Sequence, residues 1–161
     1  MAGDVAYTEV FGVPKKTDPL TIEGKPELVR RWKDAFVLID ATGMCVFVNV
    51  RYMFDDDVML WPTRLTQTMN YTTGAAYTPE TFFEAADRVF NLERMFLIKA
   101  GFTGADDTLP KRMLEEPLSE GPAKGQVVEL DEMLPAFYVE RGWDENGIPT
   151  DKKLAALVLE W

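Results

Sequence analysis

The sequence contains no histidine and only one cysteine among its 161 residues. The missing histidine excludes a self-contained Ser-His-Asp or Cys-His catalytic site, and it excludes a zinc site built on imidazole. A single thiol cannot form an internal disulfide, and by itself it cannot hold an iron–sulfur cluster, which takes about four protein ligands. Such low cysteine usage fits a reducing, cytoplasmic compartment. Self-contained chemistry would therefore depend on carboxylates, lysine, tyrosine or the thiol.

Basic clusters and long hydrophobic runs are also missing. Lys and Arg number 17 against 27 Asp and Glu, which gives a net charge of −10. Nucleic acids and anionic membranes attract clustered positive charge, so we expect neither as a partner. The apolar stretch 44–54 is interrupted by Asn49 and Arg51 and is too short to span a bilayer. Residues 1–4 have neither the basic segment nor the apolar region of a signal peptide.

Two segments have the spacing of amphipathic helices. Residues 26–39 begin with Pro26, and Thr78 followed by Pro79 is a typical start for a second helix that ends near Gly101. The expected inward positions of the first helix are Leu28, Trp32, Ala35, Phe36 and Ile39, with Arg30, Arg31, Lys33 and Asp34 on the other face. The expected apolar face of the second is Phe82, Phe83, Ala86, Val89, Phe90, Phe96, Leu97 and Ala100, which we interpret as core.

The remaining segments predict further helices and one long loop. Shorter helices are expected around 62–67, over 130–140 and after Thr150, and prolines and glycines mark 102–128 as a loop. Periodicity leaves strand and buried helix both open for 44–54. The acidic run 55–57 is interpreted as a solvated turn. We therefore predict an all-α fold, with residues 1–161 as a single helical domain.

Two sequence signatures together resemble a known family. The hexapeptide Asp40-Ala41-Thr42-Gly43-Met44-Cys45 resembles the D-x-x-G-L-C motif of the tungsten-pterin aldehyde:ferredoxin oxidoreductases. The second signature follows the family's C-terminal order: Asn91-Leu92-Glu93-Arg94, Gly101-Phe102, Asp106-Asp107, Leu109-Pro110-Lys111-Arg112, Glu116-Pro117-Leu118, Gly121-Pro122, Gly125, Met133-Leu134, Tyr138, Arg141-Gly142-Trp143-Asp144 and Gly147-Ile148-Pro149-Thr150. Together they span most of residues 24–159.

The resemblance implies a helical C-terminal part of an enzyme that oxidises small aldehydes to carboxylic acids. In that family a tungsten (or molybdenum) bis-pterin does the oxidation, and electrons leave through a 4Fe-4S cluster to ferredoxin. Asp40 is expected to bind one pterin, with the backbone of Gly43, Met44 and Cys45 beside it, and Cys45 is expected to be the fourth cluster ligand. No catalytic residue is expected in this chain. Expected partners are the remaining domains of the enzyme, a ferredoxin-type carrier and the aldehyde.

The sequence also departs from the family pattern. Met44 replaces the usual Leu, a change of similar volume. The other three cluster cysteines, the catalytic glutamate, the active-site histidine and the pterin-binding first domain have no counterpart here. We therefore expect a fragment of a larger enzyme that is inactive alone and binds neither tungsten nor a cluster.

Simpler interpretations of these residues stay open at this point. Asp40 would then close a turn, Gly43 would end a helix and Cys45 would be a small buried hydrophobe. Glu93, next to Arg94 within the predicted apolar face, suggests a buried structural ion pair rather than a catalytic carboxylate. A helical interaction module without redox chemistry is the alternative function.

Overall fold

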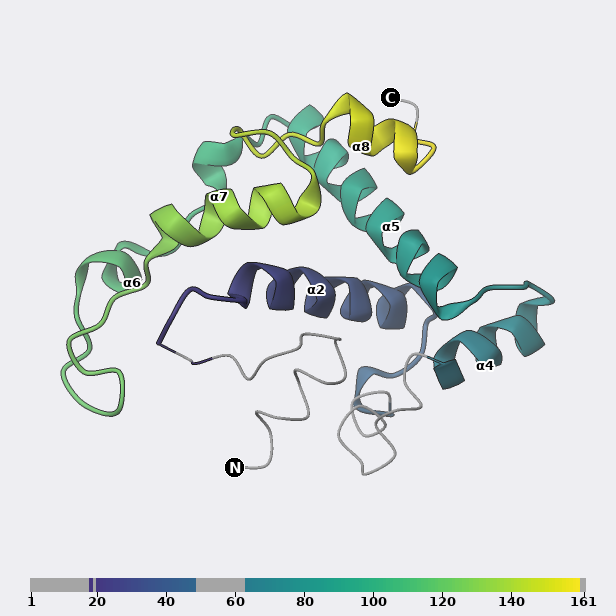
Figure 1. Ribbon diagram of the computed structural model, residues 1–161, viewed down its shortest axis with the longest axis horizontal. Helices are drawn as coiled ribbons and strands as arrows, with labels where there is room; N and C mark the ends of the chain where they lie inside the picture. The colour runs from purple at the N-terminus through teal and green to yellow at the C-terminus, as the bar shows by residue number, and fades with distance from the viewer. Residues whose placement is uncertain (1–17, 19, 49–62, 160–161) are drawn as a thin grey trace.

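The computed structural model describes residues 18, 20–48 and 63–159, and within them the fold is helical (Figure 1). The helices are α2 (Lys25–Ala41), α4 (Thr63–Thr73), α5 (Pro79–Lys99), the 3-10 helix η2 (Gly104–Asp106), α6 (Lys111–Glu115), α7 (Leu130–Arg141) and α8 (Asp151–Ala156). These described residues form no strand, only one isolated bridge between Trp143 and Pro149. The all-α prediction is confirmed.

The predicted start of the long helix α5 is confirmed. The Thr78 hydroxyl accepts a hydrogen bond from the backbone N–H of Thr81, and the Thr81 hydroxyl accepts one from the backbone N–H of Thr78. These bonds satisfy donors that a helix start otherwise leaves unpaired. The connection from α4 is held by Asn70, whose side chain donates to the Tyr77 carbonyl and accepts from the Tyr77 N–H.

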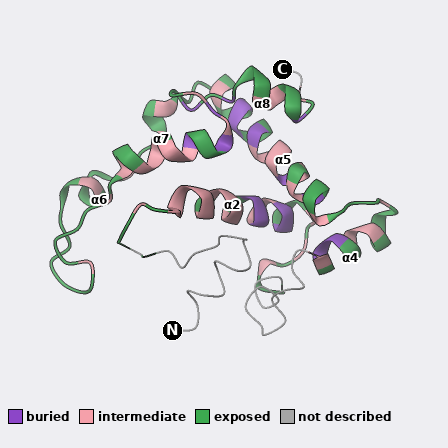
Figure 2. Ribbon diagram, viewed as in Figure 1, coloured by how far each residue is buried: buried purple, intermediate pink, exposed green. Residues whose placement is uncertain are grey.

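The main core lies where α2, α4 and α5 meet (Figure 2). Its buried members are Ala35, Leu38, Ile39, Leu65, Phe82 and Ala86. Met44, which follows α2, packs against the same cluster. Burial of each large side chain in this cluster contributes about 1.5–3 kcal/mol, so the cluster holds the C-terminal half of α2 against α5.

A second packed region joins α5 and α7 through Trp143. The Trp143 ring stacks on Phe90 with centroids 5.9 Å apart and meets Tyr138 at 5.8 Å and Phe137 at 6.1 Å. The Trp143 Nε1–H donates to Asn91 Oδ1 at 2.8 Å. The signature residues around 141–149 therefore lie between α5 and α7, and α7 in turn packs on α2.

Three details of the helix predictions are wrong or cannot be judged. Phe96, Leu97 and Ala100 are exposed, so the predicted apolar face of α5 is buried only over its N-terminal part. The helix predicted around 62–67 continues to Thr73, and the 102–128 loop contains η2 and α6. Residues 46–48 are helical. Residues 49–54 and the acidic run 55–57 lie outside the described residues.

No described helix combines the length and apolar composition that crossing a membrane requires.

Candidate functional site

The segment Asp40–Cys45 forms the exit from α2. The helix ends with the Thr42 N–H bonded to the Leu38 carbonyl at 3.1 Å and the Gly43 N–H bonded to the Asp40 carbonyl at 3.1 Å. The Thr42 hydroxyl donates to the Ile39 carbonyl at 2.8 Å. Gly43 has a φ of +68°, a left-handed conformation that glycine adopts without strain. The chain therefore turns sharply at Gly43.

The side chains of this segment divide between surface and core. Asp40 and Cys45 are exposed, whereas Met44 packs against the core. Among the described residues, a methyl group placed on Gly43 would meet no atom within 4 Å, so this side of the Gly43 backbone is open. The interpretation of Cys45 as a buried hydrophobe is wrong. The Met44 side chain is partly buried and anchors the turn.

This segment suits a cofactor that is shared with another part of an enzyme. Within the described ranges, no group of three or more Cys, Asp or Glu side chains is arranged to hold a metal ion. Cys45 would therefore contribute a single thiolate, and a cluster would need its other ligands from elsewhere. An exposed carboxylate at Asp40 accepts N–H donors of a heterocycle, and the open side of Gly43 lets a flat ring approach. These residues fit the pterin and cluster that the resemblance implies.

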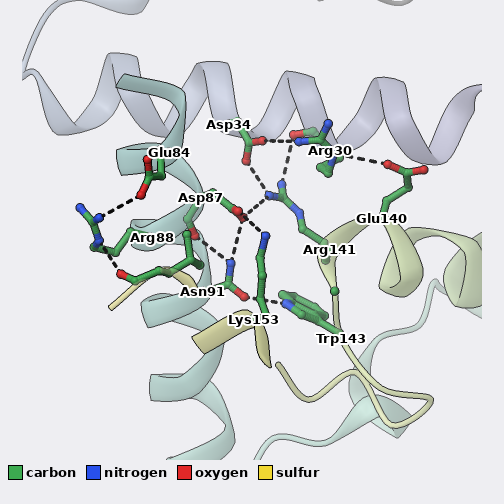
Figure 3. A network of polar contacts seen from close by, with 12 residues as sticks. Arg30, Asp34, Glu84, Asp87, Arg88, Asn91, Glu140, Arg141, Trp143 and Lys153 are labelled. Atoms are coloured by element: carbon green, nitrogen blue, oxygen red, sulfur yellow. Dashed lines mark hydrogen bonds and ion pairs between the residues drawn. The ribbon is translucent and has the colours of Figure 1, made fainter. Parts of the chain in front are cut away.

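Behind this segment, Arg141 lies at the centre of a buried polar network (Figure 3). Its Nη1–H donates to Asp34 Oδ1 at 2.5 Å, and its Nη2–H donates to the Arg30 carbonyl at 3.1 Å. Asp87 Oδ1 lies 3.6 Å from Arg141 Nη1, and the second Asp87 oxygen pairs with the ammonium of Lys153. Arg30 Nη1–H also donates to the second Asp34 oxygen at 3.2 Å, so two carboxylates face three cations from α2, α7 and α8.

Burial dominates the electrostatics of this pair. It raises the pKa of Asp34, and the Arg141 guanidinium acts in the opposite direction. Burial likewise lowers the pKa of Arg141, which the two carboxylates partly offset. The prediction that Asp34 lies on the solvent face is wrong: it is 2% exposed. Besides Arg30 on its own helix, Asp34 pairs with Arg141, which lies 107 positions away, so no local pattern could reveal that contact.

A second polar cluster is built on Arg94. Its guanidinium donates to both oxygens of Asp107, at 2.9 and 2.5 Å, and its Nε–H donates to the Gly147 carbonyl at 2.8 Å. The Tyr138 hydroxyl donates to Asp107 at 2.5 Å. Burial and this bond raise the pKa of Tyr138 to about 12. The predicted buried ion pair between Glu93 and Arg94 is wrong, because Arg94 is buried with Asp107 whereas Glu93 is exposed.

The sequence is similar to known proteins over nearly its whole length. The family described as "Aldehyde ferredoxin oxidoreductase, domains 2 & 3" matches residues 2–159. The tungsten-containing aldehyde ferredoxin oxidoreductase of Pyrococcus horikoshii is 40% identical over 154 residues, which are 94% of this chain and 24% of that protein. The protein of the same name from Pyrococcus furiosus is 42% identical over 147 residues, 89% of this chain and 23% of that protein.

A more distant relative has a name that indicates a different substrate. A Pyrococcus furiosus protein named aliphatic sulfonate oxidoreductase, WOR-like subunit, is 33% identical over 97 residues, 55% of this chain and 15% of that protein. The chain spans about a quarter of the length of the curated relatives that match most of it. From the family match over residues 2–159 and these identities, the chain belongs to the aldehyde ferredoxin oxidoreductase family and corresponds to its helical C-terminal part.

Proposed function

We propose that this chain is the C-terminal helical part of a tungsten-pterin oxidoreductase that oxidises small aldehydes to carboxylic acids. Its contribution is the turn Asp40–Cys45, where Asp40 and the backbone of Gly43, Met44 and Cys45 bind one pterin, and Cys45 is one ligand of a 4Fe-4S cluster. Tungsten (or molybdenum) on two pterins supplies the two-electron oxidation, and the cluster passes the electrons to a ferredoxin-type carrier. The proposed location is the cytoplasm.

The observation that carries the proposal is the outward presentation of this turn. Asp40 and Cys45 are exposed on one short segment, and between them the backbone of Gly43 faces open space. A structural turn accounts for the positive φ of Gly43 but does not by itself call for an exposed thiol two residues later. A shared cofactor site needs both, because the cluster ligand and the pterin contact must reach past the surface of this part of the chain.

The lengths of the relatives support a cofactor site that is shared between this chain and the rest of the enzyme. Relatives about four times as long are named tungsten-containing aldehyde ferredoxin oxidoreductases, which leaves room in the rest of such an enzyme for the other cluster ligands and the pterin-binding domain that the proposal requires. The isolated chain is accordingly expected to be inactive and to bind neither metal nor cluster. In the complete enzyme its own residues orient one pterin and hold one iron.

The test is Cys45→Ala in the complete enzyme, with Lys152→Ala on α8 as the control. Lys152 is exposed, so its loss leaves the core and the turn unchanged. We expect Cys45→Ala to lose the electron paramagnetic resonance (EPR) signal of the reduced 4Fe-4S cluster, while the control keeps it. A normal cluster signal in Cys45→Ala would refute the ligand assignment.

Large exposed apolar side chains argue against the alternative, a free-standing interaction module. Phe47 is 81% exposed, Phe96 67% and Val139 76%. A chain that works alone buries such side chains or replaces them with polar ones, whereas a part of a larger enzyme covers them with its neighbours. Their exposure therefore favours assembly with the remaining domains.

A further inference from the structure

Arg141 contacts α2 at two points that lie one helical turn apart. One contact is the carboxylate of Asp34, and the other is the backbone carbonyl of Arg30. A bond to a side chain alone would let the helix slide or rotate, because the side chain adjusts its rotamer. A carbonyl is fixed to the helix axis, so adding it removes that freedom. The guanidinium presents its donors as a rigid fork that suits such a double contact.

Arg141 is itself held firmly by the neighbouring helices. Its guanidinium carbon lies 3.8 Å from the centre of the Phe90 ring on α5, and Asp87, also on α5, faces it. The adjacent residue on α7, Glu140, lies 3.4 Å from Arg30 Nε and adds a second link to α2. The network therefore defines the position of α2 relative to α5 and α7 together (Figure 3).

Stability alone does not account for this arrangement. Burying ions costs solvation free energy, and apolar side chains of similar volume usually stabilise a fold as well or better. The Arg141 Nε–H is buried and makes no hydrogen bond to any described residue, so the guanidinium is not fully satisfied. What the charged network supplies beyond burial is a defined geometry.

That geometry extends directly to the candidate site. Asp34 and Asp40 are six residues apart on one continuous helix, which is about 9 Å along the axis. A rotation or shift of α2 therefore moves Asp40 and the turn that carries Cys45 by a similar amount. Displacements of about 1 Å matter to the geometry of a redox or catalytic site.

We propose that Arg141 is a positioning residue, which fixes the rotation and axial position of α2 through Asp34 and the Arg30 carbonyl and thereby places the Asp40–Cys45 turn. The placement is a property of this chain. Its consequence for a cofactor rests on the function proposed above.

The single cysteine allows a direct test on the full 161-residue chain. A nitroxide on Cys45 is combined with a second on Val139→Cys, an exposed position of α7, and the distance between them is measured by double electron–electron resonance. With Arg141 present, we expect a narrow distribution of distances between the two nitroxides. Arg141→Met should shift the maximum of this distribution or at least double its width.

Arg94→Met is the matched control. Arg94 is also a buried arginine with a carboxylate partner and an aromatic neighbour, but its guanidinium donates to Asp107 and to the Gly147 carbonyl, neither of which belongs to α2. Arg94→Met should lose comparable stability and keep the narrow distribution of nitroxide distances. Arg141→Lys covers the case in which Arg141→Met does not fold, because it keeps the charge but lacks the fork. An unchanged distribution in the folded Arg141 variants would overturn the proposal.

The same variants in the complete enzyme separate this proposal from the cluster assignment. If both hold, Arg141→Lys should shift the reduction potential or the EPR line shape of the cluster, with Arg94→Met unchanged. A changed Cys45–Val139 distance with an unchanged cluster would confirm the positioning role and refute the assignment of Cys45 as a ligand. An unchanged distance would refute positioning, whatever the cluster shows.

Discussion

Two glycines with almost the same backbone conformation should respond very differently to alanine. Gly43 has a φ of +68° and Gly147 a φ of +72°. In both, alanine has to adopt a left-handed conformation, which costs about 1 kcal/mol. Their surroundings differ. The new methyl group meets nothing within 4 Å at Gly43, whereas at Gly147 it would lie 2.5 Å from Arg94 Nη2 and 2.7 Å from Tyr138 Cζ.

The overlap at Gly147 cannot be relieved cheaply. Arg94 is held by both oxygens of Asp107, and Tyr138 bonds to the same carboxylate, so moving either side chain disturbs the other. Overpacking of this kind costs about 1–3 kcal/mol. Gly147→Ala should therefore lower the free energy of unfolding by about 2–4 kcal/mol, and Gly43→Ala by about 1 kcal/mol.

Urea denaturation followed by circular dichroism measures both changes. The slope m should stay constant, because neither variant alters the surface exposed on unfolding. Losses that agree within about 0.5 kcal/mol would refute the reasoning, since the backbone cost alone would then explain both variants. In the complete enzyme Gly43→Ala should in addition lower the tungsten content, because the open side of Gly43 is where a pterin would lie.

Three further predictions concern stability. Thr78→Ala should cost about 1 kcal/mol in urea denaturation, because α5 loses its cap, and an unchanged stability would contradict the cap's role. Because the pKa of Tyr138 rises to about 12 in the folded chain, its contribution is present below pH 10 and is lost as the pH rises from 10 to 12. Unfolding measured at several pH values should show a smaller loss over this range in Tyr138→Phe than in the unmodified chain, and equal losses would exclude Tyr138 as its source. Arg141→Met alone should cost about 3–5 kcal/mol, because it leaves the buried Asp34 carboxylate with Arg30 as its one remaining cation, and adding Asp34→Leu should recover most of that cost by removing the buried charge. A double variant as unstable as the sum of its parts would contradict this.

Local signals predicted the helices well. Thr78 and Pro79 start α5, and Pro26 lies in the first turn of α2, because capping and proline geometry depend only on adjacent residues. The motif Asp40–Cys45 likewise located the turn that leaves α2. Its exposure agrees with the expected contact to another part of the enzyme, whereas the roles of Asp40 and Cys45 toward a cofactor stay predictions.

The long-range contacts could not be predicted in the same way. Asp34 falls among charged neighbours on a helical projection, yet α2 packs on α5 with one face and on α7 with another, so a polar position became buried. Glu93 shows the opposite error, because the sequence predicts it to be buried whereas it lies on an exposed face of α5. Both outcomes depend on which helices meet in three dimensions.

The buried charges also set an order for folding during synthesis. Asp34 pairs with a residue 107 positions later, and Asp87 with one 66 positions later. While the chain is being made, α2 and α5 leave the ribosome with Asp34 paired only to Arg30 on its own helix and with Asp87 lacking both Arg141 and Lys153. Packing the two helices at that stage would bury negative charge that is only partly compensated. We therefore expect the core between them to reach its full stability only after Arg141 and Lys153 have emerged. A nascent chain of this kind relies on its last helices to complete its first ones, and it exposes apolar surface to chaperones until then.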